Sequence, residues 1–286
     1  MLHTLLQLHP LRALRRTLAA ALTLALLSAC AAPFDASDAL GDGLPARAAV
    51  VDVPLIKQAD FYCGPASLAM VMQWAGAEIT QEEIASLSFT PGAEGTYLAD
   101  MIGASRRLGW AATEVATWED LRQEVAAGHP VIVFQNLGVA IAPVWHYGVV
   151  TGFDQAANVV TLNSGQLEEM RLPVDIFART WARGDYWGLV VLPPDQLAAT
   201  ATQTELLAAG AALERAGQAA AAETFYETGH ARWPDNWLWL FGLANTRYAM
   251  GDLKGAERAL LQARALAPDV PEIRANLAHV RAEARR

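Results

Sequence analysis

The sequence predicts an α+β domain followed by an all-α domain. Between residues 50 and 194, helical patterns come first and strand patterns come last, which favours α+β over alternating βαβ units. After residue 196 the composition changes to Ala, Leu, Glu and Arg, which is typical of helices. The 286 residues are enough for one medium domain and one small one.

The first helix is predicted within the stretch "FYCGPASLAMVMQWAG", residues 61–76. Pro65 suits a first helical turn, because its missing N–H would have no partner there. Gly76 closes the helix. One apolar stripe is predicted from the residues Leu68, Val71, Met72 and Ala75.

Three more helices and then four strands are predicted in this domain. Thr80 and Glu83 have the spacing of a capping box. Amphipathic patterns over 96–109 and 117–128 end at glycines, and Thr117 caps the second of them. Strand patterns cover 130–136, 146–153, 158–163 and 186–192.

The region 197–286 contains a repeat of 34 residues. The pairs with this spacing are Gly217 and Gly251, Ala222 and Ala256, Pro234 and Pro268, and Leu243 and Leu277. This period resembles tetratricopeptide repeats, and a generic pair of helical hairpins is the alternative. Paired helices of this kind present a concave surface, so we expect the repeats to recruit a protein partner. Candidate lining residues are Trp233, Trp237, Trp239 and Phe241, although at that spacing some of them must belong to the core.

The first 29 residues resemble an export signal, with three arginines before a short apolar run. "LSAC", residues 27 to 30, resembles the lipobox of bacterial lipoproteins, which implies cleavage before Cys30 and lipidation of its thiol. Residues 30–49 then form a flexible tether. We expect a membrane-anchored envelope protein, in the outer membrane if the source is Gram-negative. An ordinary signal peptide is the alternative.

The charge balance argues against nucleic acid as a partner. The formal net charge is −9, and removal of three arginines with no acidic residue among 1–29 would make it about −12. No Gly-rich phosphate loop is present, and no cluster has zinc-site spacing, so neither a nucleotide nor a metal cofactor is expected.

Cys63 is the candidate nucleophile. The chain has two cysteines, and lipidation of Cys30 would leave Cys63 without a disulfide partner in an oxidising compartment. A helix N-terminus stabilises a thiolate, so we expect Cys63 to be a reactive thiol of low pKa. The alternative is a cysteine that only packs.

A thiol nucleophile needs a base, and His146 is the best candidate among six histidines. It opens the predicted strand "HYGVVTGF" between two aromatic residues. The alternative is a buried histidine bonded to the backbone.

"QADFYCGPASLAM" followed by "HYGVVTGFD", with "GHPVIVF" between them, resembles the papain-like bacteriocin-processing cysteine peptidases and their stand-alone relatives. The resemblance implies a papain-like α+β domain over 50–194 that acts on peptides. It implies Cys63 as nucleophile, His146 as base and Gln58 as oxyanion donor, with Gly64 leaving room for the substrate backbone. The orienting residue of these relatives is commonly Asp, where this chain has Asn163 and Ser164.

We expect Asn163 rather than Asp154 to orient His146. A hairpin loop over 153–156 would pair Gly152 with Ala157 and place His146 opposite Asn163. A loop one residue longer would put the two side chains on opposite faces, so the assignment depends on the register or on a bulge.

Three functions remain open from the sequence. The first is a membrane-tethered cysteine peptidase that uses Cys63, His146 and Asn163. The second is an inactive papain-like domain used as a binding scaffold. The third is a papain-like acyltransferase or amidase, because the same triad serves those reactions.

Overall fold

The computed structural model describes residues 43–286. The predicted signal peptide, Cys30 and most of the predicted tether lie outside these residues, so they stay predictions. Within 43–286, the structure contains no helix with the length and apolar character needed to cross a membrane.

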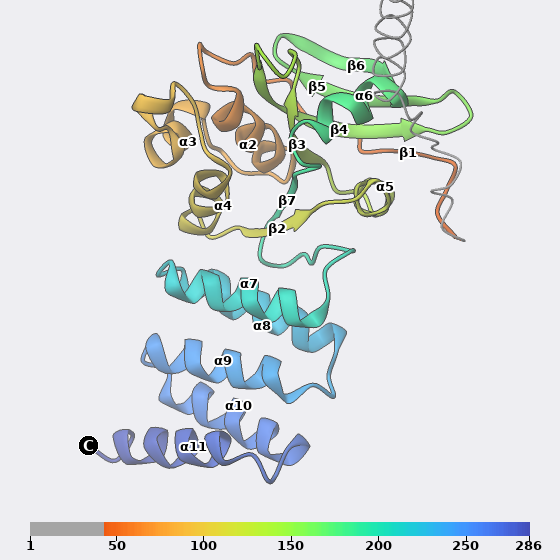
Figure 1. The fold of residues 1–286 in the computed structure, drawn as a ribbon. Helices are drawn as coiled ribbons and strands as arrows, with labels where there is room; N and C mark the ends of the chain where they lie inside the picture. Colours follow the sequence, from red (N-terminus) through yellow and green to blue (C-terminus); the bar gives the residue numbers. More distant parts are fainter. Residues whose placement is uncertain (1–42) are drawn as a thin grey trace, which may run out of the picture. The chain divides into compact units, whose positions relative to one another are not determined.

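The fold is an antiparallel sheet with helices, followed by a run of helices (Figure 1). The sheet has seven strands in the order β2-β7-β3-β4-β5-β6, and β1 pairs with β4. The strands are β1 (Arg47–Ala49), β2 (Ala111–Val115), β3 (Val131–Asn136), β4 (Trp145–Asp154), β5 (Val159–Ser164), β6 (Leu167–Pro173) and β7 (Gly188–Leu192).

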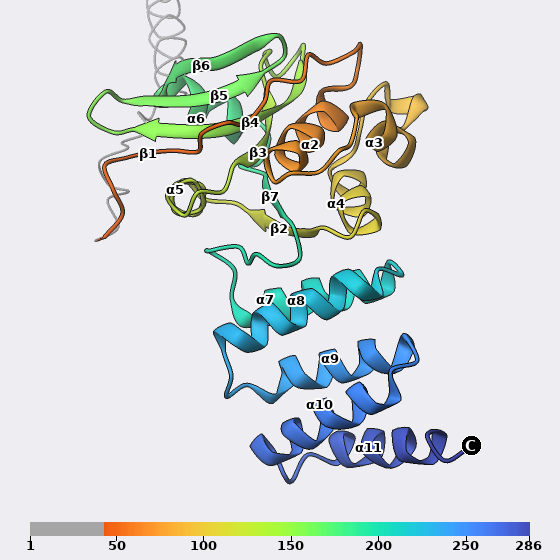
Figure 2. The same cartoon turned by 180° about the vertical axis from the view of Figure 1, so that it is seen from behind.

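The first three α-helices lie together on one side of this domain, and β5 and β6 lie on the other (Figures 1 and 2). The helices are α2 (Cys63–Trp74), α3 (Gln81–Ser88), α4 (Leu98–Arg107), α5 (Trp118–Ala126) and α6 (Val174–Ala182), with a 3₁₀ turn η2 (Pro91–Ala93) between α3 and α4. Helix α2 packs against β4, and this contact positions the candidate site.

Helix α2 begins at Cys63, so Pro65 lies inside the first turn, where its missing N–H has no partner. Ala66 N donates to Tyr62 O at 2.8 Å and closes that turn. The prediction of a single apolar stripe is wrong, because every residue from Gly64 to Met72 is buried. A helix that is apolar all round is a core element.

Two predicted helix starts are confirmed. Thr80 and Glu83 form a reciprocal capping box at α3, and the Thr117 side chain accepts from Asp120 N at α5. Elements without a strong pattern escaped prediction: β1, β2, β6 and α6. Strand β6 is largely exposed at the sheet edge, so its residues carry no buried alternation.

The helical region contains α7 (Gln203–Arg215), α8 (Ala219–Arg232), α9 (Trp237–Ala249), α10 (Leu253–Leu266) and α11 (Pro271–Glu283). Gly217 and Gly251, one period apart, both have positive φ in the turns after α7 and α9. Ala222 and Ala256, also one period apart, are fully buried where neighbouring helices pack. The 34-residue period therefore corresponds to a repeated pair of helices.

The aromatic residues expected on a partner surface contribute mainly to the core of this region. Trp239 has no exposed surface, and Trp233 stacks on it with ring centroids 5.6 Å apart. Trp237 and Phe241 are partly buried against the same core. The expectation that some of the four belong to the core is therefore confirmed for Trp239. A role of the other three in recognition stays a prediction.

Candidate active site

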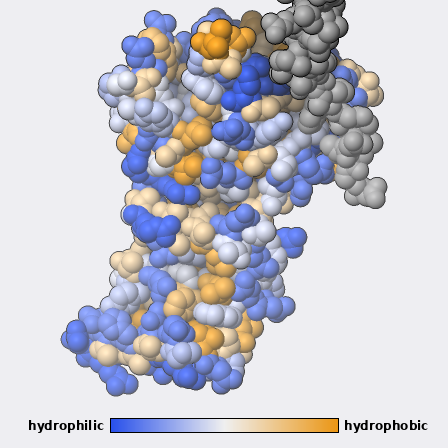
Figure 3. Space-filling model, in the orientation of Figure 1, coloured by the Kyte–Doolittle hydropathy of each residue, from blue (hydrophilic) through white to orange (hydrophobic). Residues whose placement is uncertain are grey.

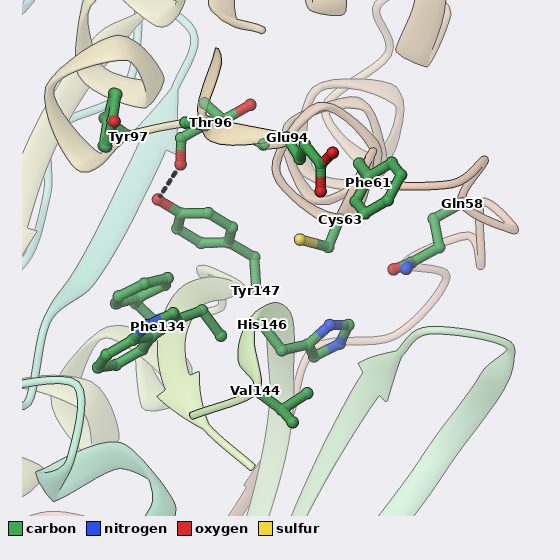
Figure 4. A pocket seen from close by; sticks show the side chains of 13 residues that line it. Gln58, Phe61, Cys63, Glu94, Thr96, Tyr97, Phe134, Val144, His146 and Tyr147 are labelled. Carbon is green, nitrogen blue, oxygen red and sulfur yellow. Dashed lines mark hydrogen bonds between the residues drawn. The ribbon is translucent and has the colours of Figure 1, made fainter. Parts of the chain in front are cut away.

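Cys63 is the first residue of α2, and its thiol faces a cavity of about 440 Å³ (Figure 4). Because α2 is buried along most of its length, its N-terminal end is the part that reaches this cavity. The thiol lies against the backbone of Tyr147 and against the amides of Cys63 and Gly64. The predicted placement of Cys63 at a helix start is confirmed.

His146 reaches the same cavity from β4. Its neighbour Tyr147 is buried and donates its hydroxyl to Thr96 O at 3.0 Å, which ties β4 to the segment before α4. Figure 4 shows Cys63, His146 and Gln58 around one space, although they come from α2, β4 and the segment before α2. The structure thus brings these three predicted residues together.

Ser164, not Asn163, contacts the imidazole. Nε2 of His146 lies 2.9 Å from Ser164 Oγ, at the end of β5. If Ser164 accepts this hydrogen bond, Nε2 carries the ring proton and Nδ1 is free to act as a base.

The side chain of Asn163 is engaged elsewhere. Its Nδ2 donates to Val53 O at 3.0 Å, and its Oδ1 accepts from Glu169 N at 2.9 Å. Asn163 is buried, so these bonds hold the end of β5 to the chain before α2 and to β6. The direct orienting contact predicted between Asn163 and His146 is therefore absent from the structure.

The predicted register is wrong for two reasons. The hairpin turn lies two residues later than expected, because Asp154 rather than Gly152 pairs next to the loop, with Val159. A shift between Val150 and Gly152 then brings Val149 opposite Asn163. A β-bulge adds a residue to one strand and displaces every pair beyond it. Asp154 lies at the turn, where Ala157 N donates to its Oδ1 at 3.0 Å.

Gln58 lies in a segment that other glutamines hold in place. Gln81 accepts from Ala59 N and donates to Lys57 O, both at 3.2 Å, so one side chain brackets Gln58. Gln166 Nε2 donates to Gln58 O at 3.3 Å. No motif marks Gln81 or Gln166 in the sequence, because each acts on a segment far away along the chain.

Gly64 is required by packing. An added Cβ would lie 2.9 Å from Thr96 Cβ and 3.0 Å from Met101 Sδ. Gly64 thus allows α2 to pack closely against Thr96 and Met101. That it also leaves room for a substrate backbone stays a prediction.

Burial favours the neutral forms of both candidate groups. It raises the pKa of the Cys63 thiol, which the backbone contacts of Tyr147 and Gly64 lower only in part. Burial also lowers the pKa of His146. The expected low pKa of Cys63 is wrong for this geometry, and no hydrogen bond joins thiol and imidazole within the described residues. Burial therefore favours thiol and neutral imidazole over an ion pair.

No group of three or more His, Cys, Asp or Glu residues within 43–286 has the arrangement of a metal site. The side chains that line the cavity can instead supply a sulfur nucleophile, a base and an amide donor. Such a set is suited to acyl transfer through a covalent thioester.

The comparisons with known proteins agree with this fold. Residues 50–184 match the Peptidase_C39 like family, and residues 213–280 match the tetratricopeptide repeat. No curated protein matches the chain.

Three solved structures are similar to its first half. A C39-like peptidase from Bacillus anthracis is 20% identical over 51% of this chain and 97% of its own, with a TM-score of 0.43. The peptidase domain of Streptococcus ComA, a bi-functional ABC transporter of a quorum sensing pathway, is 23% identical over 50% and 99%, with a TM-score of 0.42. A double glycine motif protease from an AMS/PCAT transporter, in complex with the leader peptide, is 21% identical over 51% and 94%, with a TM-score of 0.40.

The neutral resting pair predicts the pH dependence of thiol alkylation. Because burial raises the pKa of Cys63, its reaction with iodoacetamide should be slow at pH 6 and rise through a midpoint above that of a free cysteine, about 8.5. Mass spectrometry of the peptide that contains Cys63 measures the rate. His146→Ala should leave the midpoint nearly unchanged. Fast alkylation at pH 6 that His146→Ala abolishes would instead indicate a thiolate–imidazolium pair.

Proposed function

We propose that this chain is a membrane-anchored cysteine peptidase with Cys63 as nucleophile and His146 as general base. The observation that supports this most is the meeting of Cys63, His146 and Gln58 in one cavity, with Ser164 holding the far nitrogen of the imidazole. The match of residues 50–184 to the Peptidase_C39 like family supports a peptidase.

In this proposal the proton moves as the thiol attacks. Nδ1 of His146 takes the proton of Cys63 while Sγ adds to the scissile carbonyl carbon, since burial disfavours a standing ion pair. The Cys63 N–H and the Gln58 carboxamide stabilise the oxyanion. His146 then protonates the leaving amine, which leaves a thioester, and water hydrolyses the thioester with His146 again as base.

Ser164 takes the orienting role that the sequence had suggested for Asn163. Its hydroxyl oxygen accepts a hydrogen bond from Nε2–H, and this favours the tautomer in which Nδ1 is deprotonated. Asn163 acts one step further away, as a positioning residue that holds the end of β5.

We also propose that the helical repeats recruit a protein partner and carry out no chemistry. A cavity of about 420 Å³ on α10 and α11 is lined by Arg264, Arg274, Arg281 and Arg285. Figure 3 shows a hydrophilic surface at this C-terminal end. Only Arg281 of the four pairs with an acid within the described residues, namely Glu257 at 2.7 Å. An acidic segment of a partner would complement this cavity.

The catalytic proposal predicts that Cys63→Ala abolishes hydrolysis of a peptide library and labelling by a peptidyl acyloxymethyl ketone. The double variant Arg274→Glu, Arg285→Glu should hydrolyse short peptides like the wild type but bind a fluorescent decaglutamate probe at least ~10-fold more weakly. An intact Cys63 that neither cleaves nor reacts with the ketone would indicate a scaffold. Transfer to an added amine in place of hydrolysis would indicate an acyltransferase.

Removal of the Ser164 hydroxyl should slow turnover by about 10-fold or more, within the usual range for base catalysis. Ser164→Ala should also shift the tautomer of His146, which ¹⁵N NMR reports, while Ser164→Thr retains both properties. Asn163→Ala breaks two buried hydrogen bonds and should lower the free energy of unfolding by about 2 kcal/mol. Full activity of Ser164→Ala would remove Ser164 from the mechanism.

The anchoring proposal rests on the arginines near the start of the sequence, the short apolar run after them and the stretch "LSAC". Two or more acyl chains on the N-terminal Cys30 would hold the protein on a membrane, in the outer membrane if the source is Gram-negative. Cys30→Ser should abolish metabolic labelling with palmitate and release the protein from the membrane fraction. Labelling that persists in this variant would contradict lipidation at Cys30.

A further inference from the structure

The cavity at Cys63 combines apolar walls with a single carboxylate. Its aromatic lining residues are Phe61, Tyr97, Phe134, Trp145 and Tyr147. Phe134 and Trp145 stack with centroids 5.1 Å apart and form a flat wall. The one acidic residue of the lining is Glu94, and no Lys or Arg contributes to it. The cavity therefore presents a negative charge beside apolar surface.

The Glu94 carboxylate has no partner among residues 43–286. Figure 4 shows it beside Phe61 and Cys63. Within the described residues, no hydrogen bond or ion pair engages it, although the nearby Asp100 accepts from Thr90 Oγ1 at 3.0 Å. A carboxylate at the mouth of a partly apolar cavity attracts cations more strongly than one on an open surface.

The backbone at Glu94 is in a conformation that favours glycine. Its φ is 48° and its ψ is 45°, in the left-handed region. Phe61, another lining residue, has a φ of 65°. A non-glycine residue in this conformation at a cavity is consistent with a role for its side chain.

The chain around Glu94 is held in place. Thr90 N donates to Gly95 O at 2.8 Å and closes the turn that carries Glu94. Tyr147, next to His146, donates to Thr96 O at 3.0 Å. The backbone that carries Glu94 is therefore held close to the strand that carries His146.

We propose that Glu94 makes the cavity selective for a peptide residue with a cationic group on a long apolar stem, namely Lys or Arg, next to the bond that is cleaved. This inference rests on the proposed peptidase function and names its substrate class. The stem of such a residue packs on the aromatic walls while its charged end pairs with Glu94. A free α-amine offers the same cationic chemistry, so the experiment separates the two sources.

The test measures the second-order rate at which dipeptidyl acyloxymethyl ketones modify Cys63. Each probe carries Lys or norleucine, which share one stem, at the first or second residue from the ketone. N-acetylated and free-amine forms distinguish the side chain from the terminus. In the wild type, acetylated Lys probes should react at least ~10-fold faster than norleucine probes at one of the two positions, and added salt should reduce this preference.

The variants separate charge from backbone strain. Glu94→Gln should abolish the preference, and Glu94→Lys should reverse it. Glu94→Gly should also abolish it without lowering the melting temperature, because glycine adopts this φ freely. Glu78→Gln, at an exposed site away from the cavity, should keep the preference.

Equal rates for Lys and norleucine probes in the wild type would overturn this inference while leaving the peptidase proposal intact. A preference that requires the free amine would also overturn it, in favour of recognition of a peptide N-terminus. If Cys63 reacts with iodoacetamide but with none of the peptidyl probes, the proposed function itself fails, and this inference fails with it.

Discussion

The burial of α2 on all sides is the constraint on which the rest of the structure depends. Every residue from Gly64 to Met72 is buried, so the helix cannot shift or rotate without exposing core. Its contacts with β4 and with the chain at α4 fix the position of the N-terminal end of the helix. Cys63 is the residue at that end. The position of the Cys63 thiol therefore follows from the packing of α2.

The same burial determines the electrostatics of the candidate site. Cys63 and His146 are partly buried between α2 and β4, and this desolvation favours the neutral form of each group. A helix N-terminus favours a thiolate, but desolvation outweighs that effect here. In the proposed mechanism, charge would therefore develop as a substrate carbonyl accepts the sulfur.

The cavity also shows how separate segments share one task. The proposed base His146 lies on β4, the Ser164 hydroxyl that contacts it on β5, the proposed amide donor Gln58 before α2, and Glu94 after η2. Hydrogen bonds from Tyr147 and Gln81 link these segments across the fold. The helical repeats are held together by side-chain packing. Small residues such as Ala222 let neighbouring helices approach closely, and Trp239 fills space in the core between helices.

Local patterns in the sequence determined the helix starts, the 34-residue period and the setting of Cys63, since a cap or a turn depends on residues a few positions apart. That Cys63 and His146 share one site could be predicted from the sequence, because few other side chains in this domain could serve as nucleophile and base. Tertiary structure alone decided that Ser164 rather than Asn163 meets the imidazole. That choice follows from a turn two residues later than expected and one bulge, and a single-residue slip changes which side chains face each other. It also decided the pKa directions and the exposure of Glu94, because both depend on which distant segments exclude water from a group.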